Sequence, residues 1–69
     1  MLRVAVIGAG FFARFHYEAW SRLADVELVG ACDLDLSKAQ SAAAEFGGEA
    51  WDDPAAMIAG LKPDLIDIA

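Results

Sequence analysis

The hydrophobic positions of the chain follow two alternating periods. Residues 3–8 (RVAVIG) and residues 27–32 (ELVGAC) are short and almost wholly apolar, as is typical of strands that are covered on both faces of a parallel sheet. Between them, apolar positions recur at spacings of three and four, which predicts a helix over residues 11–23. The predicted apolar face of that helix comprises Phe12, His16, Ala19, Trp20 and Leu23.

Capping residues mark the next helix. Asp35 is the expected N-cap of a helix over residues 36–46, because its carboxylate can accept the free amide hydrogens of the first turn. Gly47 and Gly48 are expected to end that helix, because glycine adopts a positive φ without steric cost. Residues 49–51 can then form only a short strand.

A second capping pair opens the last helix. Asp53 precedes Pro54, and a capping acid followed by proline at the first helical position predicts a helix that stops at Gly60. Residues 62–64 (KPD) are typical of a turn, and residues 65–69 (LIDIA) are expected to form a fourth strand.

The elements therefore read βαβαβαβ, which is typical of an α/β fold with a parallel sheet. Because crossover connections are right-handed, this string favours a half Rossmann fold with the strand order 3-2-1-4. Ligands of such folds bind above the carboxyl ends of the first and fourth strands, where the strand order reverses.

A glycine-rich segment joins the first predicted strand to the first predicted helix. Gly8, Gly10 and Ala13 match the pattern G-x-G-x-x-G/A of dinucleotide-binding turns. The first glycine permits the tight turn, the second lets a pyrophosphate approach the backbone, and the third small residue keeps the helix close to the sheet. Free amides of the first helical turn, near Phe11 and Phe12, are expected to bind the anion. The alternative is a strand-to-helix turn without a ligand.

An acidic residue follows the second predicted strand. Asp33 stands about 20 residues after Ala13, the interval at which this pattern places a carboxylate on the adenosine ribose. Such a carboxylate repels a 2'-phosphate, and Leu34 offers no positive charge to receive one. We therefore expect NAD as the cofactor in preference to NADP, with a solvated loop carboxylate as the alternative role of Asp33.

Size and charge narrow the class of protein. The 69 residues fit one domain, and 58% of them are hydrophobic, which is more apolar surface than so short a chain encloses easily. We expect a homo-oligomer, most simply a homodimer, to cover the excess. The net charge of -6 disfavours nucleic acid as a partner, because phosphate contacts need clustered Lys and Arg.

Other features bear on the compartment. No apolar run approaches the ~20 residues that span a bilayer, so we expect no membrane partner. The chain enters its first strand at Arg3, which leaves no room for a signal peptide. The single cysteine, Cys32, fits a reducing compartment. These observations predict a cytoplasmic location.

The remaining reactive side chains have simpler structural explanations. His16 lies on the predicted apolar face beside Trp20, which favours a packed histidine over a catalytic one. Cys32 is expected in a buried strand as a small hydrophobe, and one Cys with one His supplies no set of metal ligands. The aromatic residues of the first helix are expected to pack in a core or a domain interface, except for Phe11 and Phe12, which stand where they can wall the nicotinamide side.

The segments VAVIGAGFFARFHYEAW, ELVGACDLDLSKAQSAAAEFG, AWDDPAAMI and DLIDIA together resemble the N-terminal domain of the Gfo/Idh/MocA oxidoreductases, the relatives of glucose-fructose oxidoreductase and inositol dehydrogenase. The resemblance covers the whole chain. Its most specific parts are the glycine turn followed by a histidine, the C-D pair after the second strand and the run D-x-I-D-I-A. It implies that Asp33 lies on the adenosine ribose. The residues that it places along the pyrophosphate are Gly8, Gly10, Phe11, Phe12 and Ala13.

Members of this family look like two-domain enzymes that use a nicotinamide cofactor to oxidise or reduce a carbinol of a sugar, inositol or similar polyol. Their T-P-x-x-x-H and E-K-P segments and their second α/β domain, which holds the substrate site, have no counterpart in these residues. Lys62 and Pro63 belong to a turn before the fourth strand rather than to an E-K-P motif. We therefore expect residues 1–69 to be an incomplete N-terminal dinucleotide-binding domain that has no catalytic residue and is inactive by itself.

Two other functions stay open on the sequence. One is a standalone module that senses NAD or associates through the open edge of the fourth strand, without catalysis. The other is a Rossmann-like enzyme for a different ligand, such as S-adenosylmethionine or FAD. The small third residue of the turn and the polyol-dehydrogenase-like flanking segments count against the latter.

Overall fold

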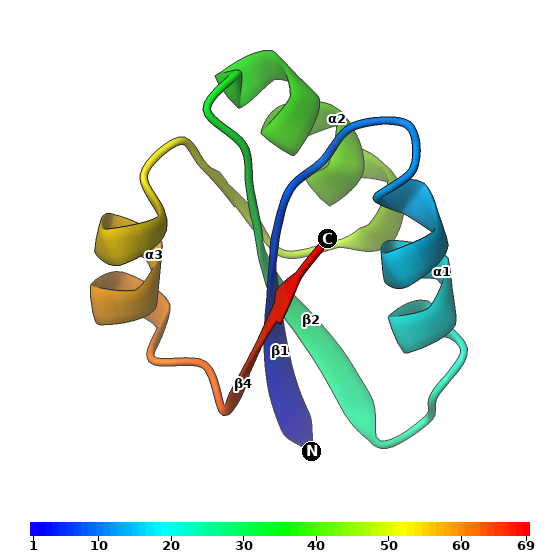
Figure 1. The fold of residues 1–69 in the computed structure, drawn as a ribbon. Coiled ribbons are helices and arrows are strands. Elements are labelled where there is room, and N and C mark those ends of the chain that lie inside the picture. Colours follow the sequence, from blue (N-terminus) through cyan, green and yellow to red (C-terminus); the bar gives the residue numbers. More distant parts are fainter.

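Four parallel strands form one sheet in the order β3-β2-β1-β4 (Figure 1). The computed structural model describes all of residues 1–69. Its strands are β1 (Leu2–Ile7), β2 (Val26–Cys32), β3 (Glu49–Trp51) and β4 (Leu65–Ile68), and its helices are α1 (Arg14–Ser21), α2 (Leu36–Phe46) and α3 (Pro54–Leu61). The predicted half Rossmann fold and its strand order are confirmed.

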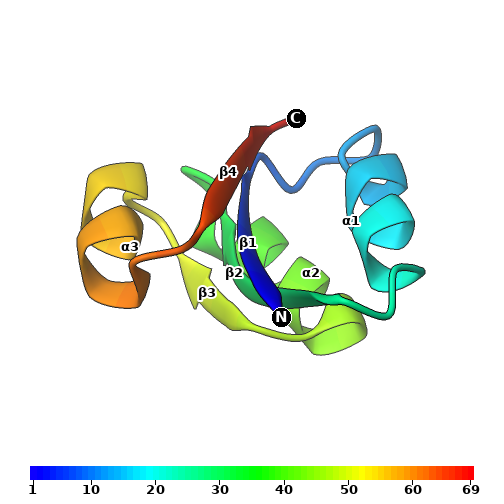
Figure 2. The same cartoon turned by 90° about the horizontal axis from the view of Figure 1, so that it is seen from below.

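The sheet is covered on both faces, which explains the apolar character of its central strand. Helices α1 and α2 lie on one side of the sheet and α3 lies on the other (Figure 2). Because side chains alternate along a strand, Val4 and Val6 pack toward α1 and α2, and Ala5 between them packs toward Met57 of α3. All three β1 residues are fully buried. The strand therefore belongs to two small cores at once.

The two predicted helix caps are present. The Asp35 carboxylate accepts a hydrogen bond from the Ser37 amide at 3.0 Å. The Asp53 carboxylate accepts hydrogen bonds from the Ala55 and Ala56 amides at 3.0 and 3.3 Å, and proline follows it in the first turn of α3. These contacts satisfy donors that a helix leaves free at its N-terminus.

The first helix begins later than its periodicity predicts. It was expected over residues 11–23, whereas α1 spans Arg14–Ser21. Residues 11–13 instead form successive tight turns, in which the Ala13 amide donates to the Gly10 carbonyl and the Arg14 amide donates to the Phe11 carbonyl. These bonds join residues three apart, so the glycine turn passes into the helix through a tighter winding than an α-helix has.

The predicted apolar face of this helix is correct at Trp20, which packs against the core, and wrong at its other four positions. Phe12 and Leu23 are 79% and 52% exposed, and His16 is exposed as well. The face that meets the sheet instead carries Ala13 and Tyr17, which are 7% and 2% exposed. The Tyr17 ring stacks on that of Phe46 in α2, with centroids 5.5 Å apart, and this packing turns the tyrosine inward. Tyrosine thus takes the core position that the pattern gave to histidine.

Removing the cap of α3 should destabilise the fold without touching the sheet. We expect Asp53→Ala to lower the free energy of unfolding by about 1 kcal/mol, because two amides lose their acceptor. The neighbouring Asp52→Ala is the matched control, since Asp52 is exposed and caps no helix. Urea denaturation followed by circular dichroism measures both variants. Equal losses would contradict the capping role.

Candidate functional site

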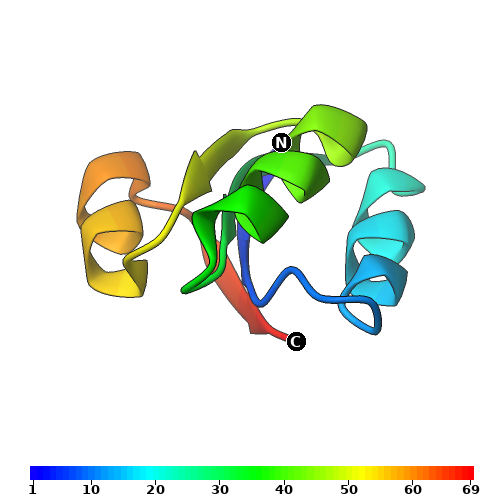
Figure 3. The same ribbon diagram turned by 90° about the horizontal axis from the view of Figure 1, so that it is seen from above.

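The glycine turn leaves the carboxyl end of β1 and crosses over toward α1 (Figure 3). Gly8 has a φ of 108°, a conformation that L side chains rarely adopt, and its amide donates to the Cys32 carbonyl at 2.7 Å. A Cβ atom at this position would stand 3.0 Å from the carbonyl oxygen of Ala69. The turn is therefore pressed between the ends of β2 and β4, and only glycine suits its first position.

The acid at the end of β2 is bonded to the same turn. One carboxylate oxygen of Asp33 accepts a hydrogen bond from the Ala9 amide at 3.0 Å, and the other accepts one from the Asp35 amide at 2.9 Å. The Asp33 side chain is half-buried. The glycine turn and Asp33, which the sequence analysis identifies separately, thus meet at one edge of the sheet. Each carboxylate oxygen keeps a lone pair for a further donor.

The first turn after Gly10 presents unused amides. Within the chain, the amide hydrogens of Gly10, Phe11 and Phe12 have no acceptor. The phenyl rings of Phe11 and Phe12 are 72% and 79% exposed and meet edge to face, while Ala13 is buried against the sheet. A Cβ atom on Gly10 would touch nothing. Free amides at the start of a helix and open space beside them are what an anion requires.

A hollow of about 120 Å³ lies beside this turn, and Arg14 and Glu45 stand at its wall. The Arg14 guanidinium donates two hydrogen bonds of 2.7 Å to the two carboxylate oxygens of Glu45. This paired geometry engages the guanidinium, and both side chains are about half exposed. Because Glu45 occupies the guanidinium, the unpaired donors that face the hollow are the backbone amides at the start of the helix.

Tyr17 is a site residue that sequence reasoning did not single out. Its hydroxyl donates to the carbonyl of Gly8 at 2.8 Å. Burial, with the nearby negative charges of Asp33 and Asp67, raises the pKa of this hydroxyl far above its ordinary value. Tyr17 is thus a neutral donor at every physiological pH. The available signal was its position four residues after Ala13, on the same helical face.

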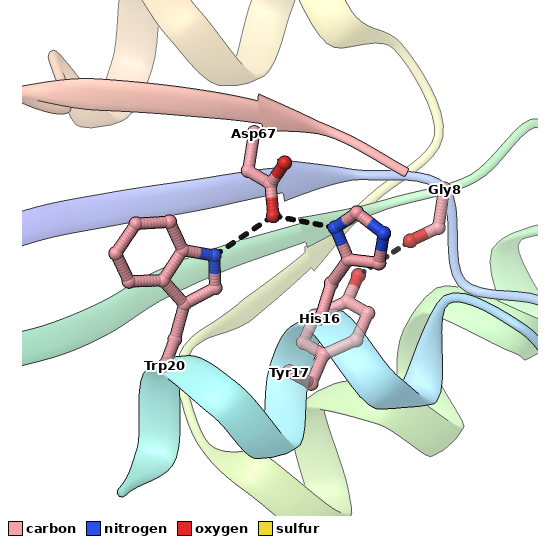
Figure 4. A network of polar contacts seen from close by, with 5 residues as sticks. All are labelled: Gly8, His16, Tyr17, Trp20 and Asp67. Carbon is pink, nitrogen blue, oxygen red and sulfur yellow. Dashed lines mark hydrogen bonds and ion pairs between the residues drawn. The ribbon is translucent and has the colours of Figure 1, made fainter. Parts of the chain in front are cut away.

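His16 and Trp20 lie on the side of α1 next to Tyr17, and both bind the carboxylate of Asp67 in β4 (Figure 4). One oxygen of Asp67 lies 2.8 Å from Nδ1 of His16 and accepts a hydrogen bond of 2.8 Å from Nε1 of Trp20. The prediction of a packed histidine is therefore wrong: 42% of the His16 side chain is exposed, and its partner is an acid rather than the core. No pattern in the sequence signals this contact, because it joins residues far apart along the chain.

The pKa of Asp67 reflects opposing influences. Partial burial raises it, but the hydrogen bonds from Trp20 and His16 and the charge of protonated His16 outweigh burial, so the pKa lies below its ordinary value.

Burial raises the pKa of the Cys32 thiol, which keeps that cysteine protonated and unreactive.

No cluster of three or more His, Cys, Asp or Glu side chains in the structure has the arrangement of a metal site. None of the helices has both the length and the apolar composition that crossing a bilayer needs.

The depressed pKa of Asp67 predicts a pH dependence of stability. The unfolded chain takes up the proton first as the pH falls, so the stability from this carboxylate is complete above about pH 4 and is lost at lower pH. We expect Asp67→Asn to flatten the decline of melting temperature over that acidic range. Asp25→Asn, at an exposed loop residue, is the control. Parallel declines in wild type and Asp67→Asn would contradict the assignment.

Comparisons with known proteins agree with this fold. Residues 2–69 match the model of the oxidoreductase family with an NAD-binding Rossmann fold. The chain is 45% identical over 69 residues to the D-glucoside 3-dehydrogenase of Escherichia coli (strain K12), a match that covers 97% of this chain and 20% of the relative. It is 41% identical over 66 residues to the D-apiose dehydrogenase of Paraburkholderia graminis, with 94% of this chain and 18% of the relative covered.

A solved structure shares the fold. The WlbA dehydrogenase from Bordetella pertussis, in complex with NADH and UDP-GlcNAcA, superposes with a TM-score of 0.90 at 28% identity, over 99% of this chain and 21% of that one. The chain spans about a fifth of the length of the relatives that it matches.

Proposed function

Because this chain belongs to the oxidoreductase family with an NAD-binding Rossmann fold, we propose that it is the NAD(H)-binding domain of a sugar or polyol dehydrogenase. Sugar dehydrogenases among its relatives support the class of substrate. The observation that carries the proposal is the hydrogen bond between the Ala9 amide and Asp33, which joins the glycine turn to the acid.

The residues of the turn fit the dinucleotide. Unused amides of Gly10, Phe11 and Phe12 would donate to the pyrophosphate oxygens, and the absent side chain of Gly10 leaves the space that this approach needs. Gly8 and Ala13 shape the turn rather than touch the anion through side chains. This arrangement explains how a chain with a net charge of -6 would bind a negatively charged cofactor.

Asp33 would select between the two nicotinamide cofactors. Its carboxylate stands beside the turn and can accept the hydroxyl hydrogens of the adenosine ribose. A 2'-phosphate at that position would meet a fixed negative charge, so NADH should bind more tightly than NADPH.

Chemistry on the substrate would come from residues beyond these. When bound, the nicotinamide supplies the hydride chemistry, and the protein must add a group that moves the proton of the carbinol. The chain's own residues hold and orient the cofactor. We therefore assign residues 1–69 as a dinucleotide-binding part and place the substrate domain in the remainder of a longer enzyme, in line with the fifth of the relatives' length that the chain spans.

A second candidate function is a standalone module that senses NAD or associates through the open edge of β4, without catalysis. The open edge of β4 and the exposure of Ile68, at 76%, favour it, because an unpaired strand can accept another strand. Light scattering with and without NADH tests this candidate. A monomer of unchanged mass in both conditions would count against it and against a homo-oligomer.

Changing Asp33 tests the choice of cofactor. Asp33→Asn keeps an acceptor for the Ala9 amide and removes the negative charge, so we expect NADH binding to weaken about tenfold and the preference over NADPH to shrink. Calorimetric titration with each cofactor measures both effects, and Asp25→Asn is the control of equal charge change. An unchanged ratio of the two affinities would remove Asp33 from the site.

Changing Gly10 separates binding from folding. A Cβ atom at Gly10 meets no atom of the chain, so Gly10→Ala should leave the melting temperature unchanged while its methyl group obstructs the pyrophosphate. We expect the dissociation constant for NADH to rise by about tenfold or more, a loss of about 1.4 kcal/mol. Gly8→Ala is the contrasting variant, since its positive φ and the contact with Ala69 should destabilise the fold itself. Wild-type affinity in Gly10→Ala would contradict the proposed function.

A further inference from the structure

Helix α1 is attached to its surroundings by contacts from its side rather than by a cap. Ala13 occupies the N-cap position and provides no side-chain acceptor for the first turn. The helix therefore lacks the local device that positions α2 and α3. The bonds of the Gly8 and Ala9 amides to the end of β2 hold the start of the glycine turn, and side chains along the helix can hold its other end.

Two neighbouring stripes of the helix supply those contacts, one with His16 and Trp20 and the other with Tyr17 (Figure 4). His16 and Trp20 both reach the same oxygen of Asp67, each at 2.8 Å. Tyr17, which follows His16, donates to the carbonyl of Gly8 at 2.8 Å. One stripe thus holds the helix to β4 and the other holds it to the glycine turn.

The strand that carries Asp67 also borders the turn. Asp67 lies opposite Val6 in the register of β4 on β1. Two residues later, the Ala69 amide donates to the Ile7 carbonyl at 2.9 Å, and the Ala69 carbonyl is the atom that a side chain at Gly8 would strike. A displacement of β4 relative to α1 would consequently change two contacts of Gly8, with Ala69 of the strand and with the Tyr17 hydroxyl of the helix.

We propose that Asp67 is a positioning residue for the anion site: its carboxylate holds α1 at the distance from β4 at which the amides of the glycine turn receive the cofactor. The inference rests on the proposed function. Asp67 acts through His16 and Trp20 and touches no cofactor itself. Its effect should reach the affinity, because losing one amide hydrogen bond to an anion raises a dissociation constant by about tenfold or more.

The donors explain why an acid stands at this position. With Nδ1 of His16 as a donor, one carboxylate oxygen satisfies two N–H groups, and the partly buried indole of Trp20 would otherwise lack an acceptor. His16 and Asp67 form an ion pair when His16 is protonated. Because the Asp67 side chain is only 19% exposed, water screens this pair only partly. An alanine at this position would leave both donors without a partner on β4.

The test compares two carboxylates near opposite ends of β4. Asp67→Ala removes the acceptor of His16 and Trp20, whereas Asp64→Ala removes the acceptor of the Arg3 amide, 2.9 Å away at the far end of the sheet. Calorimetric titration with NADH, below the melting temperature of each variant, reports the affinity of folded protein. Both variants should melt earlier, but only Asp67→Ala should raise the dissociation constant, by about tenfold or more.

Conservative variants complete the test. Asp67→Asn keeps a carbonyl acceptor and should restore most of the affinity, and Trp20→Phe, which keeps a ring but loses one donor, should raise the dissociation constant even if Asp67→Ala fails to fold. If Asp67→Ala folds and binds NADH with unchanged affinity, the positioning role is overturned and the proposed function stands. If Asp67→Ala does not fold, unchanged affinity in Trp20→Phe has the same consequence. An equal rise in Asp64→Ala also overturns the positioning role, and absence of NADH binding by the wild-type chain overturns both.

Discussion

The exit of the central strand is the constraint on which the rest of this structure depends. Strand β1 is buried on both faces, so the chain can leave the sheet only at its end, between the ends of β2 and β4. Gly8 makes that exit with a φ of 108° and without room for a side chain. The direction of the turn, the start of α1 and the meeting of the turn with Asp33 all follow from this one position.

The elements of the fold could be predicted from sequence because their determinants are local. Two buried strands appear as apolar runs, and the caps at Asp35 and Asp53 lie next to the helices that they begin. The candidate site was largely predictable for the same reason. Gly8 is needed for what its own backbone does, and Gly10 and Asp33 are located by counting along the turn pattern.

What the sequence did not reveal depends on contacts between distant segments. Tyr17 was missed as a site residue because its role is fixed by stacking on Phe46 and by a bond to Gly8, neither of which periodicity can register. The pattern predicts His16 on the face of α1 that meets the sheet, but Ala13 and Tyr17 occupy that face and His16 lies on the exposed side next to it. Its acid partner lies on the last strand, which no local pattern connects to the first helix.

The exposure of the aromatic pair after Gly10 then has a structural reason. Large apolar side chains are normally buried, yet Phe11 and Phe12 lie outside the core in a part of the chain whose next residue, Ala13, is buried. The tight turns leave the amides of the pair without acceptors. Water can satisfy these exposed amides in the free chain, but two large exposed rings beside them contribute no burial to the fold. A bound dinucleotide would replace the water on the amides and cover the rings, which supports a role for this turn in binding as well as in folding.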